Sequence, residues 1–364
     1  MSISVAIFIK ILYNMYMQKN TRLATRQENI IAKLKQADLR GRGGANFPTH
    51  SKWQMFADVD ADKKYIVANG SEGEPNVLKD GYILKNHPEV LVEGLKIALE
   101  TFKSSEAFIF LRRDYFKKYK KKLEKLIGDL PITVFREHGG YLSGEETVLC
   151  EEIEKNLPAR PRTKPPYPGQ VGINGLPTLI NNIETFYYVA KISKNEYKKT
   201  RLYSITGKTF YKGVFELPVA WSIKKILTET KALPEFDYFV QVGGGASGDI
   251  LLASETTQQV SGSGAIIIYD KEQTDPWVLM RTWIDFFMNE NCDKCTPCRE
   301  GSYRILEMVR DRQFDKKVLD DLFFVLENTS YCALGKSIPL PFRSLIKKIF
   351  KSPKPPLSRG LTKF

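Results

Sequence analysis

The chain has 364 residues, a length that suits two or three domains with a sizeable buried core. Hydrophobic residues make up 42% and charged residues 27%, which excludes a mostly disordered chain, a collagen and a coiled coil. Lysines and arginines number 55 against 42 aspartates and glutamates, and the resulting net charge of +13 favours anionic partners. Nucleotides, nucleic acid and acidic protein surfaces all meet that description.

The apolar runs of the sequence are short. None reaches the roughly 20 residues that a membrane-spanning helix needs, and even a run such as Val5 to Ile9, among the longest, stops after five residues at Lys10. The N-terminus also lacks the basic region and the small-residue cleavage site of a secretory signal. We therefore expect an intracellular protein without direct membrane insertion, in which residues 1–25 form a poorly defined extension.

Helices, strands and glycine-rich loops alternate in the first half of the chain. Ile30, Ile31 and Leu34 have helical spacing, and this helix should end near Leu39, where a glycine-rich loop begins. The pattern then predicts a strand over residues 65–68, a loop over 69–75, a helix over 90–101, a strand over 107–111 and a lysine-rich helix over 112–125. Such alternation is typical of α/β architecture.

The lysine-rich helix has two interpretations, a solvated face or a nucleic-acid patch. Its aromatic residues, Tyr115, Phe116 and Tyr119, fit a single buried helical stripe better than a platform for stacking bases. The sequence therefore favours the solvated face.

The second half of the chain changes character twice. Six prolines between Pro158 and Pro177 require an extended, irregular connection. Short β-rich runs then surround one helical stretch, Ser222 to Glu229, which indicates a small α+β domain over residues 201–270. After Trp277 the pattern is helical, and the tail from Lys351 is rich in proline and lysine.

The cysteines carry the strongest chemical signal. Cys292, Cys295 and Cys298 have Cys-x-x-Cys-x-x-Cys spacing, and Cys332 follows as a distant fourth thiol. Position 302 is serine, so the pattern lacks the nearby fourth cysteine of two-cluster ferredoxins and predicts one isolated iron–sulfur cluster. Structural zinc and a metal-free group of thiols remain alternatives. Cys150 has no partner in the pattern and is expected to be buried.

Two glycine-rich loops resemble phosphate cradles. The backbone N–H groups of residues 41–44 could bind an anion, but a tight turn explains the same glycines equally well. Residues 243–248 match G-x-G-x-x-G after an apolar strand, with Asp270 at the end of the next strand. We discount a dinucleotide site there, because residues 249–260 are too short and too rich in serine and threonine for a crossover helix.

Paired carboxylates occur at Glu72 and Glu74 and at Glu145 and Glu146. Their spacing alone does not establish acid–base catalysis. Carboxylates on glycine loops more often bind hydroxyls or backbone amides than transfer protons.

Five blocks in a fixed order make the pattern specific. They are LRGRGGANFP at residues 39–48, NGSEGEP at 69–75 with Lys79 and Asp80, GYLSGEET at 140–147 with RTKPPYP at 162–168, NNIET at 181–185, and CDKCTPCREG at 292–301 with CALG at 332–335. Over roughly residues 30 to 345 the chain resembles the NADH-binding flavoprotein subunit of respiratory complex I, the NADH-quinone oxidoreductase-F family. Soluble relatives in NAD-linked hydrogenases and formate dehydrogenases share these blocks.

The resemblance implies a multidomain α/β fold. A Rossmann-like domain binding FMN and NADH would occupy residues 26–198, and a ubiquitin-like β-grasp domain of the SLBB type residues 199–272. A C-terminal helical bundle with an iron–sulfur site would occupy residues 273–350, before a flexible tail over 351–364. These domains match the three zones of composition.

The resemblance also implies the site residues. The first glycine loop, with Gly41, Arg42, Gly43, Gly44 and Lys52, would contact FMN and the nucleotide, and Phe47 would stack on NADH. The other cofactor-binding residues would be Asn69, Glu72 and Glu74 in a second loop, Tyr141, Gly144, Glu145 and Glu146 in a third, Lys164 and Tyr167 beside the adenine, and Asn181, Asn182 and Thr185 near the phosphate. Cys292, Cys295, Cys298 and Cys332 would hold a [4Fe–4S] cluster.

The chain departs from the family pattern at several of these positions. Serine stands at 71, where the family usually has an aspartate that holds the ribityl chain of the flavin. Ser143 replaces a common cysteine, Asn46 a common glycine, and Gly81 a usual arginine. Met55 and Phe56 stand where a second aromatic contact to NADH is usual.

The function implied is that of an NADH dehydrogenase (diaphorase) subunit. Hydride would pass from NADH to FMN, and single electrons would pass to the cluster and then to partner subunits, among them a thioredoxin-like [2Fe–2S] subunit and further iron–sulfur proteins. The cofactors would carry this chemistry, so no residue is expected to act as a catalytic base.

The sequence also leads to an expected assembly and leaves two alternative functions open. No extra ferredoxin-like region is evident at either end, which favours a complex I type subunit in the cytoplasm, at the periphery of a membrane complex. The alternative is the diaphorase subunit of a soluble NAD-linked hydrogenase or formate dehydrogenase. An alternative of another class is a basic, zinc-stabilised module that binds nucleic acid; the flavoprotein interpretation expects no nucleic acid.

Overall fold

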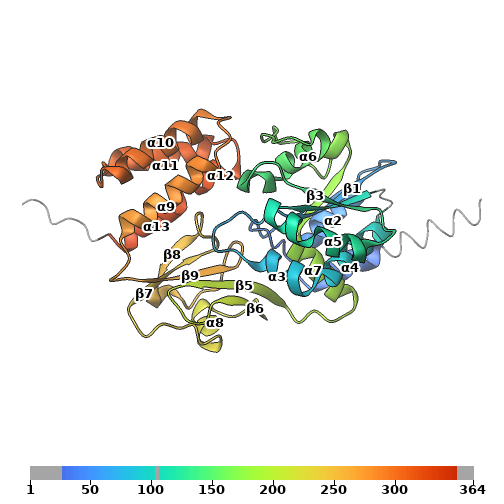
Figure 1. Ribbon diagram of the computed structural model, residues 1–364, viewed down its shortest axis with the longest axis horizontal. Coiled ribbons are helices and arrows are strands. Elements are labelled where there is room, and N and C mark those ends of the chain that lie inside the picture. The colour runs from blue at the N-terminus through green and yellow to red at the C-terminus, as the bar shows by residue number, and fades with distance from the viewer. Residues whose placement is uncertain (1–26, 103–105, 351–364) are drawn as a thin grey trace, which may run out of the picture.

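The computed structural model describes residues 27–102 and 106–350 of the chain. The extension at residues 1–25 and the tail at 351–364 lie outside the described residues. In chain order, the elements form a parallel sheet with helices, a mixed sheet with one α-helix, and a set of C-terminal helices (Figure 1). The expected α/β architecture with C-terminal helices is therefore confirmed at this level.

The first sheet is parallel throughout and has the strand order β3-β2-β1-β4. Its strands are β1 (Tyr65–Gly70), β2 (Glu106–Leu111), β3 (Ile132–Arg136) and β4 (Thr178–Asn182). Side chains of β1 alternate between two cores: Ile66 and Ala68 belong to one, Tyr65 and Val67 to the other. Burial of both faces is typical of parallel sheets with crossover helices.

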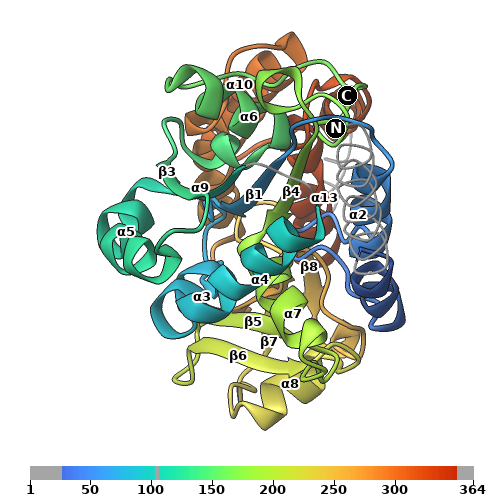
Figure 2. The same cartoon turned by 90° about the vertical axis from the view of Figure 1, so that its right-hand side faces the viewer.

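Helices cover the two faces of this sheet. After helical residues 27–36 come α2 (Thr49–Ala57), α3 (Lys79–Asn86), α4 (Pro88–Thr101), α5 (Arg113–Ile127), η1 (Tyr141–Gly144), α6 (Glu146–Lys155), η2 (Ile173–Gly175) and α7 (Ile183–Ser193). Leu95 of α4 and Phe186 of α7 belong to the larger core, and Leu149 of α6 belongs to the smaller one. Figure 2 shows α4 and α7 side by side.

The second sheet is mixed and has the strand order β6-β5-β9-β7-β8, with β5 and β9 parallel and the other pairs antiparallel. Its elements are β5 (Thr200–Gly207), β6 (Gly213–Pro218), α8 (Ile223–Glu229), β7 (Tyr238–Val242), β8 (Asp249–Leu252), η3 (Ala253–Glu255) and β9 (Ala265–Asp270). Ile223, Ile226 and Leu227 of α8 pack into the core beneath the strands.

The C-terminal helices are α9 (Pro276–Asn289), α10 (Thr296–Arg310), α11 (Lys316–Thr329), α12 (Ala333–Ser337) and α13 (Pro339–Lys348). Trp283 and Phe287 of α9 are fully buried among them. Helix α13 contacts the mixed sheet at β8, where Ile250 N donates to Ser344 Oγ at 3.1 Å and Lys348 Nζ donates to Ile250 O at 2.7 Å. The helices and the mixed sheet therefore share one interface.

Several expectations about elements are confirmed. The strands expected in residues 65–68 and 107–111 are β1 and β2, the helix in 90–101 is α4, and the lysine-rich helix is α5. Tyr119 of α5 is buried in the larger core, with Tyr115 and Phe116 packed against it, as the solvated-face interpretation requires. Among residues 27–102 and 106–350, no helix has both the length and the apolarity to cross a membrane.

The packing of α4 on α7 depends on one glycine. A Cβ atom at Gly94 would lie 2.1 Å from the carbonyl oxygen of Phe186. We expect Gly94→Ala to lower the free energy of unfolding by about 3 kcal/mol, because backbone must move to accept the methyl group. Urea unfolding of the variant and of Gly169→Ala provides the test, since a Cβ at Gly169 would meet nothing within 4 Å. Equal stabilities of the two variants would contradict the prediction.

Candidate functional site

The site lies at the carboxyl edge of the parallel sheet. From β1 the chain adds β2 and then β3 on one side of the sheet, whereas β4 lies on the other side of β1. The strand order therefore reverses at β1. In open α/β sheets, ligands bind outside the carboxyl ends of the strands at such a reversal. The chain leaves β1 through the loop at residues 70–78 and leaves β4 directly into α7, so two of the predicted cofactor loops meet there.

The first glycine loop packs against the start of α7. Arg42 N donates to Thr185 Oγ1 at 3.1 Å, and a Cβ atom at Gly43 would lie 3.4 Å from Asn182 Cβ. Gly44 has φ +115° and open space around its missing side chain. Asn46 has φ 54°, a left-handed conformation that asparagine tolerates better than most residues. Asparagine can therefore replace the usual glycine at this turn.

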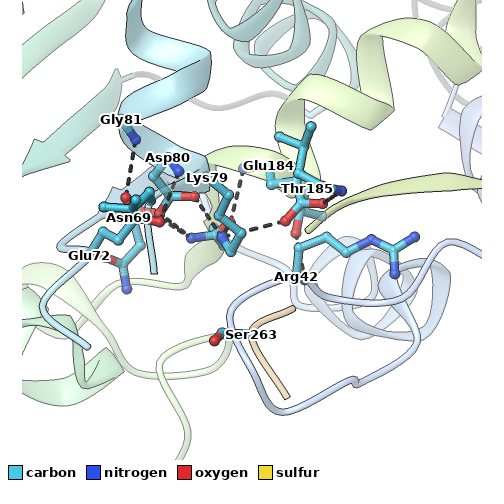
Figure 3. Close-up of polar contacts among 12 residues, drawn as sticks. Arg42, Asn69, Glu72, Lys79, Asp80, Gly81, Glu184, Thr185 and Ser263 are labelled. Atoms are coloured by element: carbon cyan, nitrogen blue, oxygen red, sulfur yellow. Dashed lines mark hydrogen bonds and ion pairs between the residues drawn. The ribbon is translucent and has the colours of Figure 1, made fainter. Parts of the chain in front are cut away.

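The guanidinium of Arg42 does not face the glycine loop. It is buried, and its Nη2 donates to the hydroxyl of Tyr197 at 3.1 Å and to Thr200 O at 3.3 Å. The group also lies 5.5 Å from the ring centroid of Tyr188. Figure 3 shows this side chain directed away from Lys79. Arg42 thus ties the loop to α7 and β5, and its contact with FMN and the nucleotide stays a prediction.

A buried ion network joins α3 to the start of α7. Lys79 Nζ lies 2.6 Å from Asp80 Oδ1, 2.9 Å from Asn182 Oδ1 and 3.5 Å from Glu184 Oε2 (Figure 3). Burial alone would lower the pKa of Lys79, but the charges of Asp80, Glu184 and Glu72 outweigh it and raise the pKa. Burial raises the pKa of Asp80 to about 6, against the attraction of Lys79.

Asn182 connects this network to the sheet. Its Nδ2 donates to Asp80 Oδ2 at 2.7 Å and to Asn69 O at 3.2 Å, and its Oδ1 accepts from the N–H of Glu184. Asn69 in turn donates to Gly144 O at 2.9 Å, which links the second loop to the third. The neighbouring Asn181 accepts from Trp53 Nε1 at 2.9 Å once its amide is oriented to satisfy both partners. The predicted asparagines therefore fix the loops to one another.

Glu72 caps helix α3. Its two carboxylate oxygens accept from Asp80 N at 2.9 Å and Gly81 N at 3.1 Å, and the hydroxyl of Tyr115 donates to it at 2.7 Å. A Cβ atom at position 81 would lie 2.5 Å from that hydroxyl, so glycine makes room for Tyr115. The hydroxyl of Tyr115, from α5, therefore fills the space beside position 81, where the family usually has an arginine.

Glu74 binds the loop at residues 243–248, whose G-x-G-x-x-G pattern resembles that of a dinucleotide site. Its Oε1 accepts from Ala246 N at 2.9 Å, Ser247 N at 2.9 Å and Ser247 Oγ at 3.0 Å. Backbone donors that could have bound a phosphate therefore bind a carboxylate of the chain itself, which agrees with discounting a dinucleotide site in this loop. Burial and the neighbouring Glu74 raise the pKa of Tyr141.

The third loop is held by ionisable groups. Glu145 caps α6 by accepting from Thr147 N at 2.9 Å and Val148 N at 3.1 Å, and Lys164 Nζ contacts its other oxygen at 2.7 Å. Lys52 of α2 forms an ion pair with Glu146. The structure thus brings together Lys52, Glu145, Glu146 and Lys164, which the sequence analysis assigned to one cofactor site.

Two predicted aromatic contacts remain exposed. Phe47 retains 47% of its exposure and Tyr167 retains 57%, whereas Phe56 is buried. Exposed rings at Phe47 and Tyr167 suit stacking on a planar ligand. Met55, also exposed, stands where the family usually presents the second ring.

Glu137 is a buried group of the site that the sequence analysis missed. Ser71, which stands where aspartate is usual, donates its hydroxyl hydrogen to Glu137 Oε2. Burial raises the pKa of Glu137 to about 7, although Ser71, Arg112 and the backbone of Arg113 act to lower it. Ser143, the other serine substitution, donates to Glu152 Oε1 at 2.7 Å. No local signal marks either pair, because neither serine has a patterned spacing to its carboxylate.

The four cysteines gather among the C-terminal helices. Cys295 precedes α10, Cys298 lies within it, and Cys332 precedes α12. Burial, and then the neighbouring thiols of Cys295, Cys332 and Cys292, raise the pKa of Cys298 to about 12. Metal binding must therefore displace the proton of this thiol. Cys150 lies apart and fully buried in the smaller core of the parallel sheet, as expected.

In the described part of the chain, no three cysteine, histidine or acidic side chains are arranged to hold one metal ion.

The cysteine region contacts the third loop. The ring of Tyr141 lies 5.1 Å from that of Phe286 in α9, and Tyr141 N donates to Glu290 at 2.7 Å. Nearby, the hydroxyls of Thr163 and Tyr331 are 2.6 Å apart. Tyr331 directly precedes Cys332. The fourth cysteine is thus tied to the connection that follows α6.

The buried position of Lys79 leads to a stability prediction. We expect Lys79→Met to lower the free energy of unfolding by about 3–5 kcal/mol, because the buried carboxylates of Asp80 and Glu184 lose their counter-charge. The exposed Lys85→Met variant of the same helix serves as the control and should lose less than about 0.5 kcal/mol. Denaturant unfolding measures both, and a similar loss in the two would refute a role for the network.

Comparison with known proteins adds independent findings. A model described as the Nuo51 FMN-binding domain matches residues 34–191, and one described as the NADH-ubiquinone oxidoreductase-F iron-sulfur binding region matches residues 278–352. The first covers the parallel sheet and its loops, and the second covers all four clustered cysteines.

Individual relatives span nearly the whole chain. The NADH-quinone oxidoreductase-F subunit of Streptomyces coelicolor is 31% identical, over 89% of this chain and 82% of its own. NAD-reducing hydrogenase HoxS subunit alpha of Cupriavidus necator is 30% identical, over 90% of this chain and 60% of its own. An NAD+-reducing [NiFe]-hydrogenase in the H2-reduced state has a similar structure, with TM-score 0.80 and 28% identity over 88% of this chain. This chain spans 61% of that hydrogenase chain. It therefore belongs to the NADH-quinone oxidoreductase-F family, with an FMN-binding domain and a [4Fe–4S]-binding region.

Proposed function

We propose that the chain is the NADH-oxidising flavoprotein subunit of a larger electron-transfer assembly. The observation that carries the proposal is the contact between the cysteine region and the third loop, through Tyr141 with Phe286 and Thr163 with Tyr331. This contact would place an iron–sulfur cluster beside a flavin bound at the carboxyl edge of the parallel sheet. Electron transfer between the two needs such proximity.

The residues available fit both cofactors. For FMN, the chain offers the open turn at Gly44 and polar side chains on the loops after β1 and before α6. For the cluster, it offers four thiols among the C-terminal helices. We propose Cys292, Cys295, Cys298 and Cys332 as its ligands.

The cofactors and the protein have different roles in the proposed reaction. When bound, FMN would supply the chemistry of hydride acceptance and single-electron release, and the protein would orient and insulate the reactants. Phe47 and Tyr167 offer exposed rings for NADH, and Lys164 offers a cation beside Glu145. The carboxylates of Glu72 and Glu74 accept hydrogen bonds from backbone donors and so act here to set the geometry of the loops.

The proposed domains follow the elements. We assign residues 26–198 to a Rossmann-like domain, 199–272 to a β-grasp domain and 273–350 to the cluster domain. The β-grasp assignment is supported by a five-stranded mixed sheet with a parallel pair, β5 and β9, and one packed helix, α8.

The assembly is proposed to be of the complex I type, with the chain at its periphery and a thioredoxin-like [2Fe–2S] protein among its partners. The likeness to the Streptomyces protein over 82% of its length supports this. A NAD-linked hydrogenase is the second candidate, supported by the TM-score of 0.80 to the hydrogenase structure.

Anaerobic spectroscopy tests the proposal. The full chain, purified without oxygen and reconstituted with FMN, iron and inorganic sulfide, should show flavin and iron–sulfur absorption that NADH bleaches. It should also reduce ferricyanide with NADH. A protein that takes up neither flavin nor iron, and that shows no such activity, would rule out the function. Zinc binding with salt-sensitive nucleic-acid binding would favour the alternative module.

A second prediction separates the two cofactors. Cys332→Ser should abolish most iron–sulfur absorption while leaving FMN bound and reducible by NADH, because the hydrogen bonds described for the proposed flavin loops do not involve this thiol. Cys150→Ala is the matched control and should retain iron, since Cys150 lies in another core. Iron content and the visible spectrum provide the measurement. Full iron retention in Cys332→Ser would remove this residue from the ligand set.

A further inference from the structure

Glu137 is a buried carboxyl group among the loops of the proposed flavin site. It directly follows β3 at the carboxyl edge of the parallel sheet, and the residue is 6% exposed. Ser71, on the loop after β1, donates its hydroxyl hydrogen to Glu137 Oε2. Two loops that leave non-adjacent strands are therefore joined by a serine and a carboxyl group.

The charged surroundings of Glu137 come from neighbouring elements. The backbone of Arg113, in the first turn of α5, and the adjacent Arg112 both act to lower the pKa of Glu137. Glu152 of α6 opposes its negative charge. Glu152 is itself occupied, because it accepts from His138 N at 2.8 Å, Gly139 N at 3.1 Å and Ser143 Oγ at 2.7 Å. Glu137 retains acceptor capacity beyond the Ser71 donor, because a carboxylate accepts about four hydrogen bonds.

Ser71 also lies against the third loop. A Cβ atom on Gly144 would be 3.3 Å from Ser71 O and 3.6 Å from Ser71 Oγ. Both loops are expected to contact FMN, and position 71 is where the family usually presents an aspartate to the ribityl chain. Position 71 therefore lacks the usual carboxyl group, but the carboxyl group of Glu137 lies beside it.

We propose that Glu137, acting through Ser71, supplies the carboxyl group that orients the polyol chain of FMN in this protein. A hydroxyl that donates to a carboxyl group becomes a stronger acceptor, so Ser71 Oγ can receive a hydrogen bond from a flavin hydroxyl. Glu137 is a positioning residue, and the inference rests on the proposed flavin site.

The test moves the carboxyl group between the two positions. Glu137→Gln should raise the dissociation constant of FMN for the full chain about tenfold, as expected for weakening one hydrogen bond to a charged group. Adding Ser71→Asp to that variant should return the dissociation constant to within about threefold of the unmodified chain, because a carboxyl group again lies in the site. Quenching of FMN fluorescence provides the readout.

Controls separate this role from a purely structural one. Glu89→Gln removes the same charge from an exposed position on α4 and should leave FMN affinity unchanged. If Glu137 only stabilised the turn after β3, Ser71→Asp would not rescue the variant, and that outcome would overturn the inference. Unchanged affinity in Glu137→Gln would also overturn it. Absence of FMN binding by the unmodified chain would instead count against the proposed function.

Discussion

The carboxylate of Glu74 joins three parts of the molecule that are distant in sequence. It extends from the loop after β1, accepts three hydrogen bonds from Ala246 and Ser247 beside the mixed sheet, and lies near Tyr141 of the third loop, whose pKa its charge helps to raise. Tyr141 in turn contacts α9, which leads to the cysteines. A carboxylate with several donors is costly to remove, because each donor would lose its partner. The relative placement of the sheets and the helical region therefore depends strongly on this residue.

The same device recurs throughout the site. Glu72 caps α3, Glu145 caps α6, and Glu184 accepts from Leu202 N at 2.9 Å to join α7 to β5. Each carboxylate satisfies backbone N–H groups that a helix start or a strand leaves unpaired. These carboxylates, whose pairing in the sequence could suggest acid–base catalysis, thus set the geometry of the loops. Such a role is compatible with a reaction whose chemistry the cofactors supply.

Features governed by local pattern could be predicted from the sequence. The strands β1 and β2, helix α8 and the grouping of the cysteines follow from periodicity and spacing. Strand β8 could not be predicted, because its four residues, DILL, are too short to show alternation. The direction of Arg42 and the pairing of Ser71 with Glu137 were also beyond prediction, because both depend on contacts between segments distant in the chain. Motifs located the site, and tertiary contacts determined what each side chain does there.

The departures from the family pattern have local structural counterparts. Asn46 adopts a left-handed conformation at a glycine position, and Gly81 leaves room for the hydroxyl of Tyr115. Ser143 binds Glu152, just as Ser71 binds Glu137. In each case a substitution that looks damaging alone is accommodated by backbone conformation or by a neighbour. Because a buried polar group needs its partner, such changes are tolerated together far more readily than singly. If these loops hold FMN as proposed, the divergent positions form a flavin site rebuilt with different side chains.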